Sequence, residues 1–359
     1  MSQRENVNPI REQNHRKNSR RYQKRAAARR RRNTIFIMEI VLLLILAVVL
    51  FFVSKLSKIE KTKLDMDKIE VNEDISQESR KIMKGYQTIA MFGLDNRSNG
   101  NLSQGRSDVI MLANINNDTK EVKLVSVYRD TYLDTGDGIF QKCNAAYAKG
   151  GPEQAISMLN VNLDLNITDY VTVDFNSIIE CVDLLGGVDM EITDDEASLM
   201  TGYIRELNEL TGNKAENLTQ GGTYTLNGVQ ACAYARIRYG GGDDYRRTER
   251  QRTVLTAMVK KAQQSDLTTV NKLINEVCGD IQTSFSNAEL LALASQVFQY
   301  SIGDTTGFPF TKTTRVLSKK TGDVVIPCDL SDNVKELHIF LYEDSAYTAS
   351  DTVKQNSEK

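Results

Sequence analysis

Histidine is nearly absent from this 359-residue sequence, which contains only His15 and His338. His15 lies in a basic N-terminal arm, so a Ser-His-Asp or Cys-His catalyst, or a His-rich zinc site, would depend on His338 alone. We therefore do not expect histidine-based catalysis. The phosphate-binding pattern G-x-x-x-x-G-K-[ST] is also absent, which argues against a nucleoside triphosphatase.

Cysteine is scarce as well, and its spacing excludes the common cysteine sites. The five residues are never closer than 38 positions, so no C-x-x-C redox or zinc pair exists, and an odd count argues against a disulfide framework. We expect most of them to be small buried apolar groups. A bridge between Cys278 and Cys328 stays open.

The rest of the composition is that of a globular chain, with 40% apolar and 26% charged residues and only four prolines. The net charge of -2 conceals an asymmetry, because residues 1–32 contain 12 Lys and Arg against two Glu. The remaining sequence is therefore acidic. Its length is enough for one large domain or two smaller ones.

An apolar run from Ile35 to Val53 contains one ionisable residue, Glu39. It is long enough to cross a bilayer as a helix, at about 1.5 Å per residue. A cleavable signal peptide is the main alternative, but lysines rather than small residues follow the run. The arginines that precede it predict a cytoplasmic arm (1–33), a transmembrane helix (34–53) and an extracytoplasmic remainder.

The basic arm also has a nucleic-acid interpretation, because clustered arginines bind phosphates without any fold. It lacks interleaved aromatic residues and a recognition-helix pattern. We expect it to act as a topology signal that contacts anionic membrane lipid, and we expect no nucleic-acid partner.

Beyond the membrane segment, the sequence predicts a stalk (54–84), a folded domain (85–343) and a disordered polar tail (344–359). Strand-like and helix-like segments alternate in the domain, which indicates a single α/β domain with a mixed sheet flanked by helices. Strands are expected at 86–92, 109–115, 122–127 and 188–192, and helices at 152–159, 175–185 and 245–263.

Two carboxylates flank the loop between the first two predicted strands. If these strands pair as neighbours, Asp95 and Asp108 lie close together, although 13 residues separate them. Such a pair suits Mg²⁺, which favours one or two carboxylates with waters and ligand phosphates. The alternative is that both residues only cap turns in a long loop.

Several arginines are expected near the same strand ends. Arg97 and Arg106 lie in the loop, and Arg129 follows the third strand. Arg236 and Arg238 would share one face of an extended segment. Five arginines at strand ends favour an anionic ligand such as a polyphosphate, which arginine forks and a divalent cation would hold.

The predicted helix over 245–263 gives the strongest local argument. Val254 and Met258 mark its apolar stripe, and steps of three and four residues toward the N-terminus lead to Gln251 and Arg247. The core-facing stripe therefore becomes polar at the helix end that favours anions. Asp244 is a candidate N-cap.

With these residues in view, the chain resembles the LytR-CpsA-Psr family, which transfers cell-wall glycopolymers. The resemblance spans most of residues 86–263 and extends more loosely to about 342. Eight motifs carry it in order: Gly93-Leu94-Asp95-Asn96-Arg97, Arg106-Ser107-Asp108, Tyr128-Arg129-Asp130-Thr131-Tyr132, Asn144-Ala145-Ala146-Tyr147, Val173-Asp174-Phe175, Leu185-Gly186-Gly187-Val188, Tyr234-Ala235-Arg236-Ile237-Arg238 and Asp244-x-x-Arg247-x-x-Arg250-Gln251.

The resemblance implies a membrane-anchored phosphotransferase that depends on Mg²⁺, with Mn²⁺ as a substitute. Its donor would be a polyprenyl-pyrophosphate-linked glycopolymer, such as teichoic acid or capsule, with the lipid in an apolar tunnel. Its acceptor would be a peptidoglycan hydroxyl, C6 of N-acetylmuramic acid, and polyprenyl phosphate would leave. Phosphoryl transfer needs mainly positioning and charge neutralisation, so the scarcity of histidine is consistent with it.

The resemblance also assigns residues to roles. Asp95 and Asp108 match the metal-binding acids. The residues that match the family's pyrophosphate-binding arginines are Arg106, Arg129, Arg236, Arg238 and Arg247. Gln251 is grouped with them, as is Arg97, which lies in the same loop as Arg106. The catalytic residues would be Arg129, Asp244 and Arg247. Asp244 matches a family acid that orients an arginine or activates the acceptor.

Two departures from the family pattern are visible. Tyr128 stands where proline is common, which would shift the entrance of the lipid tunnel, and Cys143 replaces an aliphatic residue. Two other functions stay open: a pyrophosphatase acting on the same lipid, and a non-catalytic membrane-bound sensor or regulator of cell-wall assembly. The sequence does not identify the glycopolymer.

Overall fold

Three consecutive strands form an antiparallel unit at the centre of the sheet: β2 (Tyr86–Leu94), β3 (Ser107–Asn116) and β4 (Glu121–Val127). In β3, Ile110 and Leu112 belong to one buried cluster, whereas Met111 and Ala113 belong to another. Side chains alternate between the two faces of a strand, so both faces of this sheet are covered. The three strands confirm the predicted ranges to within two residues at each end.

A computed structural model of the protein describes residues 60–61, 64–94, 102, 105–238, 243–266, 269, 272–273, 281–319 and 321–359. Residues 55–359 form one compact unit. The expected cytoplasmic arm (1–33) and membrane helix (34–53) lie outside the described residues. Within the described ranges, none of the helices combines the length and apolar character that crossing a bilayer requires.

Four more strands complete a seven-stranded mixed sheet in the order β1-β10-β7-β2-β3-β4-β11. They are β1 (Glu60–Lys61), β7 (Asp169–Asp174), β10 (Ile281–Thr283) and β11 (Ser301–Phe308). β7 runs parallel to β2, and β11 runs parallel to β4. The expected mixed sheet is therefore confirmed.

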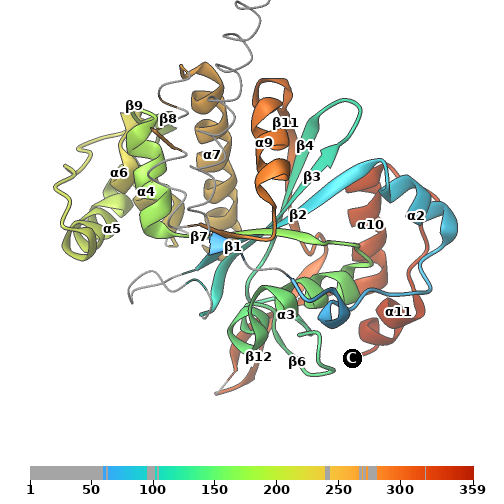
Figure 1. Cartoon of the computed structure of the whole chain (residues 1–359). Helices are drawn as coiled ribbons and strands as arrows, with labels where there is room; N and C mark the ends of the chain where they lie inside the picture. Colours follow the sequence, from blue (N-terminus) through green and yellow to red (C-terminus); the bar gives the residue numbers. More distant parts are fainter. Residues whose placement is uncertain are drawn as a thin grey trace, which may run out of the picture. The chain divides into compact units, whose positions relative to one another are not determined.

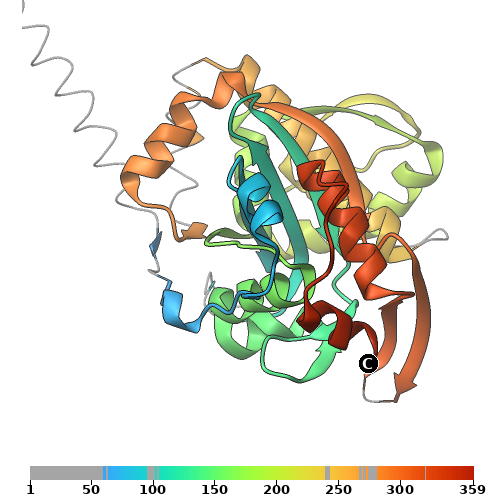
Figure 2. The ribbon, with the colours of Figure 1, turned by 90° about the vertical axis from the view of Figure 1, so that its right-hand side faces the viewer.

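Helices cover both faces of this sheet (Figures 1 and 2). On one face, α3 (Ala145–Leu163), α10 (Leu330–Tyr342) and α11 (Asp351–Ser357) pack on Phe92 and Leu112. On the other face, α7 (Asp243–Gln264) and α9 (Asn287–Ser295) pack on Met111. α3 begins before the predicted Pro152, with a kink at Gly150 and Gly151.

A second apolar cluster lies beside α7 and is built around a small hairpin. Its elements are α4 (Phe175–Leu184), β8 (Val188–Ile192), α5 (Asp194–Thr211), β9 (Gly222–Leu226) and α6 (Gly228–Arg236). β8 and α4 agree with prediction. The expected extended segment over Tyr234–Arg238 is wrong, because α6 ends only at Arg236. A capping box joins Asn227 to Gln230, and the apolar residues that follow, up to Tyr234, are buried.

Two further hairpins lie near the lower end of the sheet in Figure 1. They are β5 (Tyr132–Asp134) with β6 (Phe140–Lys142), and β12 (Lys312–Ser318) with β13 (Gly322–Pro327). Two 3-10 turns complete the fold, η1 (Met66–Lys68) and η3 (Val297–Gln299).

The expected stalk over 54–84 is wrong for its described part, which packs on the domain. Ile69 and Ile75 are buried, and α2 (Gln77–Met83) follows them. The buried Asn72 side chain donates to the carbonyl of Val161 and to the carboxylate of Asp164. Isolated apolar residues in a polar segment gave too weak a signal to reveal this packing.

The expected disorder of the tail over 344–359 is also wrong. Tyr347 and Val353 are buried, and the Tyr347 ring stacks on His338 with centroids 3.8 Å apart. The buried carboxylate of Asp164 accepts hydrogen bonds from the Tyr347 hydroxyl and the Ser350 backbone. These few contacts order a segment whose overall composition is polar.

Candidate active site at the carboxyl edge of the sheet

The strand directions bring several chain ends to one edge of the sheet. β2, β4, β7 and β11 all end there, and β3 starts there, because Leu94 is the register partner of both Ser107 and Asp174. Arg129 follows β4, and Asp108 is the second residue of β3. The topology thus places these two side chains together.

Arg129 is the centre of a compact charged cluster. Its Nη1 donates to Asp108 Oδ1 at 2.7 Å, and its Nε lies 3.6 Å from Asp130 Oδ2 and 3.8 Å from Asp244 Oδ1. Although burial opposes the charge, these carboxylates raise the pKa of Arg129, so it stays protonated. Its guanidinium is held in place by acids from three different segments.

Asp244 and Arg247 form the second half of the cluster at the start of α7. Arg247 Nη2 lies 2.7 Å from Asp244 Oδ1, and the Arg247 side chain is only 5% exposed. Burial raises the pKa of Asp244, although Arg247 and Arg129 oppose this. Asp244 is the second residue of the helix and faces the two arginines, so the N-cap alternative is not supported.

Several buried polar atoms of this cluster have no hydrogen-bond partner within the described part of the chain. They are Nε of Arg129, Oδ2 of Asp244, Nε of Arg247 and Oε1 of Gln251. Buried polar groups are normally satisfied, and exceptions concentrate at functional sites. Arginine donors gathered in this way suit a bound phosphate or pyrophosphate.

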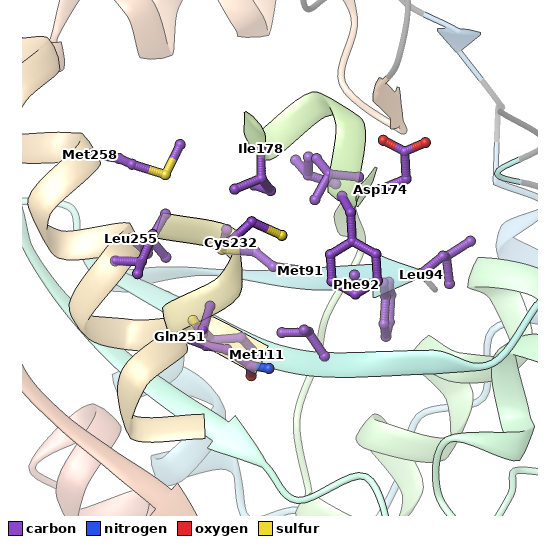
Figure 3. Close-up of a pocket in the computed structure, with 17 residues that line it drawn as sticks. Met91, Phe92, Leu94, Met111, Asp174, Ile178, Cys232, Gln251, Leu255 and Met258 are labelled. Carbon is purple, nitrogen blue, oxygen red and sulfur yellow. The ribbon is translucent and has the colours of Figure 1, made fainter. Parts of the chain in front are cut away.

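An apolar pocket of about 120 Å³ adjoins the cluster (Figure 3). Met91 of β2, Met111 of β3 and Met258 of α7 line it, whereas the Phe92 ring lies on the opposite face of the sheet, 5.2 Å from the Tyr147 ring. Gln251 also lines this pocket, one turn along α7 from the buried Arg247. The predicted stripe is confirmed: Val254, Met258 and Gln251 face inward together, and Arg247 continues the row into the charged cluster.

Gly93 allows the strands beneath this pocket to come close together. A Cβ at Gly93 would lie 2.9 Å from both Cβ and Cγ2 of Val109, closer than such atoms approach. The Gly93–Val109 pair also precedes the register shift at Leu94. This shift is where β2 turns toward the loop that contains Asp95.

The other predicted arginines are spread more widely. Arg238 lines a polar cavity together with Arg129 and Asp244. Arg236 instead pairs with Glu206 at 3.2 Å and lies 5.0 Å from the Phe175 ring, so the two do not share one face as expected. Arg106 is exposed at the start of β3.

Only one of the two predicted metal-binding acids, Asp108, lies among the described residues. Asp95 and Arg97 lie outside the described residues, whereas Asp108 is 24% exposed and contacts Arg129. The described residues contain no group of three His, Cys, Asp or Glu that would hold a metal ion. The carboxylates of Asp108 and Asp244 are nevertheless hard donors beside a predicted phosphate site, a donor set that fits Mg²⁺ when phosphate and water complete its shell.

Sequence reasoning missed Lys142 and the packing partner of Tyr128. Lys142 pairs with Asp130 at 2.9 Å, and no pattern in its three-residue strand marked it. Tyr128 is not among the residues that line the apolar pocket; it packs on Tyr245, with ring centroids 4.6 Å apart. Cys143 is buried, and its Sγ donates to the carbonyl of Tyr128, which explains its tolerance at this position.

The expected buried cysteines are confirmed in part. Cys143 and Cys232 are buried, Cys181 is half-buried and Cys328 is exposed. Cys278 lies outside the described residues, so its pairing with Cys328 stays untested.

Comparison with known proteins agrees with this geometry. The teichoic acid transferase TagU of Enterococcus faecalis is 30% identical over 210 residues, which are 58% of this chain and 64% of that protein. The structure "TagT bound to LI-WTA" covers 79% of this chain and 99% of its own, with 21% identity and a TM-score of 0.60. A TagT structure with bound octaprenyl pyrophosphate lipid covers 72% of this chain and 92% of its own, with 21% identity and a TM-score of 0.52.

The matched part of this chain is thus slightly less than two thirds of the length of TagU. The likeness to the solved structures supports the fold. A model of the LytR_cpsA_psr family matches residues 46–315, three quarters of the sequence. The chain therefore belongs to the LytR_cpsA_psr family.

Proposed function

We propose that this protein is a membrane-anchored phosphotransferase that moves a glycopolymer from a polyprenyl-pyrophosphate carrier to a peptidoglycan hydroxyl. One observation carries the proposal: buried arginines with unpartnered donors lie at the end of an apolar pocket, joined through Gln251. An amphiphile with a long apolar tail and a pyrophosphate head matches both the apolar pocket and the arginine cluster. The names of the similar transferase and of the lipid-bound structure support the same reading.

The apolar pocket would hold the part of the polyprenyl chain nearest the pyrophosphate. Its lining comes from the sheet on one side and from α4, α6 and α7 on the other. Such a lining binds a hydrocarbon by excluding water and offers it no competing polar contacts. The remaining lipid would extend toward the membrane, where residues 34–53 would anchor the chain with its domain outside.

Arg129 and Arg247 would bind the two phosphates of the carrier. Their positions are fixed by Asp108 and Asp244, so little reorganisation is needed when charge develops in transfer. Arg238, which shares a cavity with Arg129, would contact the glycan-side phosphate. Arg97, Arg106 and Arg236 would contribute at the rim.

The transfer forms one P–O bond and breaks another. The acceptor oxygen, from C6 of N-acetylmuramic acid, attacks the phosphorus that carries the glycan. The bond from that phosphorus to the bridging oxygen breaks, and polyprenyl phosphate leaves. The hydroxyl proton passes to Asp244, whose raised pKa suits a proton acceptor and whose contacts also orient Arg247.

Asp95 and Asp108 would hold a Mg²⁺ ion, with Mn²⁺ as a substitute. When bound, the ion neutralises charge on the pyrophosphate and helps to align it. Asp108 lies between Ser107 and Val109, the register partners of Leu94 and Gly93, and Asp95 directly follows Leu94 in the sequence. This adjacency supports the pairing of the two acids.

A transfer assay with the full-length protein tests the proposal. The detergent-solubilised chain is incubated with a synthetic lipid-pyrophosphoryl glycan, Mg²⁺ and a peptidoglycan oligomer, and products are identified by mass spectrometry. We expect a phosphodiester-linked glycan on the oligomer and polyprenyl phosphate. Free glycan phosphate alone would indicate a pyrophosphatase, and unchanged donor would indicate a sensor or regulator.

A further inference from the structure

A second, polar cavity meets α7 at Asp244 and Tyr245, whereas the apolar pocket meets this helix from Gln251 to Met258, so the buried Arg247 lies between them along the helix. The volume of the polar cavity is about 630 Å³, and it is open to solvent. Arg129, Arg238 and Asp244 form its floor, so it meets the proposed site of phosphate chemistry. Its far wall comes from the β12–β13 hairpin, through residues that include Arg315 and Asp323.

This hairpin is attached directly to the Arg129 segment. The backbone N–H of Val325 donates to the Asp130 carbonyl at 2.9 Å, and Val325 forms a parallel bridge with Thr131. The hairpin wall therefore cannot move independently of the loop that holds Arg129.

The base of the hairpin is fixed as well. The buried Asn333 side chain accepts from the Thr311 backbone N–H at 2.9 Å and donates to the Thr311 carbonyl at 3.0 Å. Lys312 lies over the rings of Tyr128 and Tyr245, with Nζ 5.0 and 4.7 Å from their centroids. Although the hairpin projects from the fold in Figure 2, it starts from a rigid base.

The cavity carries charges of both signs. Arg129, Lys142, Arg238 and Arg315 supply cations, whereas Asp130, Asp244 and Asp323 supply anions. Arg315 is exposed and makes no ion pair with any described residue, whereas Lys142 is paired with Asp130. A glycan with amides, hydroxyls and one carboxylate suits this mixed lining, in which Arg315 is the cation free to pair with the carboxylate.

The direction of attack also limits what this cavity can hold. In an in-line displacement, the incoming oxygen approaches from the side opposite to the leaving group. If the apolar pocket holds the lipid of the leaving group, the acceptor must enter from the far side of the arginine cluster. The polar cavity is the space on that side.

We propose that the polar cavity is the acceptor subsite and that Arg315 on β12 binds the lactyl carboxylate of an N-acetylmuramic acid residue that carries no stem peptide. This inference rests on the proposed function. Tyr245 and Val324 would face the sugar ring beside it. The family match ends at residue 315, within β12.

Direct binding tests this subsite without turnover. Isothermal titration of the full-length protein in detergent would compare a disaccharide of N-acetylglucosamine and N-acetylmuramic acid with neutral chitobiose. We expect Arg315→Gln to weaken binding of the first about tenfold, as for loss of a charge-assisted hydrogen bond, and Arg315→Glu to weaken it further. Chitobiose should bind more weakly and depend little on Arg315. Lys335→Gln, which changes an exposed cation on α10, is the matched control.

Thermal unfolding of the variants shows that the fold is kept. Equal disaccharide affinity in Arg315→Gln and wild type overturns the proposal. A glycerol phosphate oligomer that binds more tightly than the disaccharide and loses affinity in Arg315→Gln also overturns it, by placing the donor polymer here.

Kinetics then separate this inference from the proposed function. In the transfer assay, Arg315→Gln should raise KM for the acceptor about tenfold and act little on KM for the donor. Absence of turnover in wild type, with disaccharide binding that still depends on Arg315, rejects the transferase and retains a glycan-binding site at Arg315 without its role as acceptor subsite. Normal turnover with an unchanged acceptor KM retains the transferase and rejects the subsite.

Discussion

Nη2 of Arg247 lies 2.7 Å from Oδ1 of Asp244, one turn earlier on the same helix. The same carboxylate oxygen is 3.8 Å from Nε of Arg129, which comes from the end of β4. One acid therefore aligns two arginines from separate elements. Oδ2 of this acid and the Nε atoms of both arginines find no hydrogen-bond partner among the described residues, so the group is arranged for a ligand.

Replacing Arg247 by lysine tests whether its planar fork holds the pyrophosphate. Arg247→Lys keeps the charge but loses bidentate geometry, which costs about 1.5–3 kcal/mol, or about 10- to 150-fold in kcat/KM for the lipid donor. The exposed Lys260 on the same helix gives a matched control, and Lys260→Arg should change kcat/KM less than twofold. Equal kinetics in the two variants, at equal thermal stability, would move the pyrophosphate site to Arg129 and Arg238.

The pH dependence of transfer tests the role of Asp244 as proton acceptor. Burial raises its pKa despite Arg247 and Arg129, and only the ionised carboxylate accepts a proton. Activity should therefore fall as the pH drops through this raised pKa, above the ordinary value of about 3.9. Asp244→Asn should lower kcat/KM about 100-fold at neutral pH and lose this acidic limb. An acidic limb that persists in Asp244→Asn would assign it to another group.

The dependence of transfer on Mg²⁺ tests the proposed metal-binding role of Asp108. Asp108→Ala should reduce turnover at least about 100-fold and weaken Mg²⁺ binding measured by calorimetry in the presence of inorganic pyrophosphate. Asp118, an exposed residue of the β3–β4 turn, provides the control, and Asp118→Ala should leave both quantities unchanged. The metal assignment fails if Asp108→Ala binds Mg²⁺ as wild type does.

The sequence was most informative where local pattern and tertiary position agree. Strand alternation and glycine-bounded runs gave β2, β3, β4 and β8, and helical spacing placed Arg247 and Gln251 on the inner face of α7. These predictions needed only the strand and helix periods. Pairing of β2 with β3 then followed from their proximity in the chain.

The sequence was least informative where a few long-range contacts decide the structure. Asp164 binds Tyr347 and Ser350 from nearly two hundred residues away, and no local pattern reveals such a partner. The wrong prediction that Arg236 and Arg238 share one face came from applying the strand period of two to a segment that is helical up to Arg236. Short segments of alanine and alternating polar residues satisfy either period, so only the capping box at Asn227 would have distinguished them.

Filling the apolar pocket tests whether it binds the lipid. Ile178 on α4 lines the pocket, and tryptophan there would occupy much of its volume. Ile178→Trp should raise KM at least about tenfold for a long polyprenyl donor and much less for a donor with a short lipid. Ile139→Trp changes an exposed residue in the β5–β6 turn and is the control. Equal losses for long and short lipids would separate the pocket from lipid recognition.

The tail gives the sharpest stability test, because its one buried tyrosine bridges distant segments. The Tyr347 hydroxyl donates to the buried carboxylate of Asp164, which also accepts from Asn72 near the start of the domain. Tyr347→Phe leaves that acceptor without one donor while keeping the stacked ring on His338, and should lower the free energy of unfolding by about 1–3 kcal/mol.

Tyr224 provides the matched control for this substitution. Its hydroxyl donates to the Gln220 carbonyl at 2.9 Å at the surface, where water can replace it, so Tyr224→Phe should change stability by less than about 0.5 kcal/mol. Urea titrations followed by circular dichroism at neutral pH would measure both values. Equal stability of Tyr347→Phe and Tyr224→Phe would mean that the tail is bound by apolar packing of Tyr347 and Val353, with no net contribution from the buried hydrogen bond.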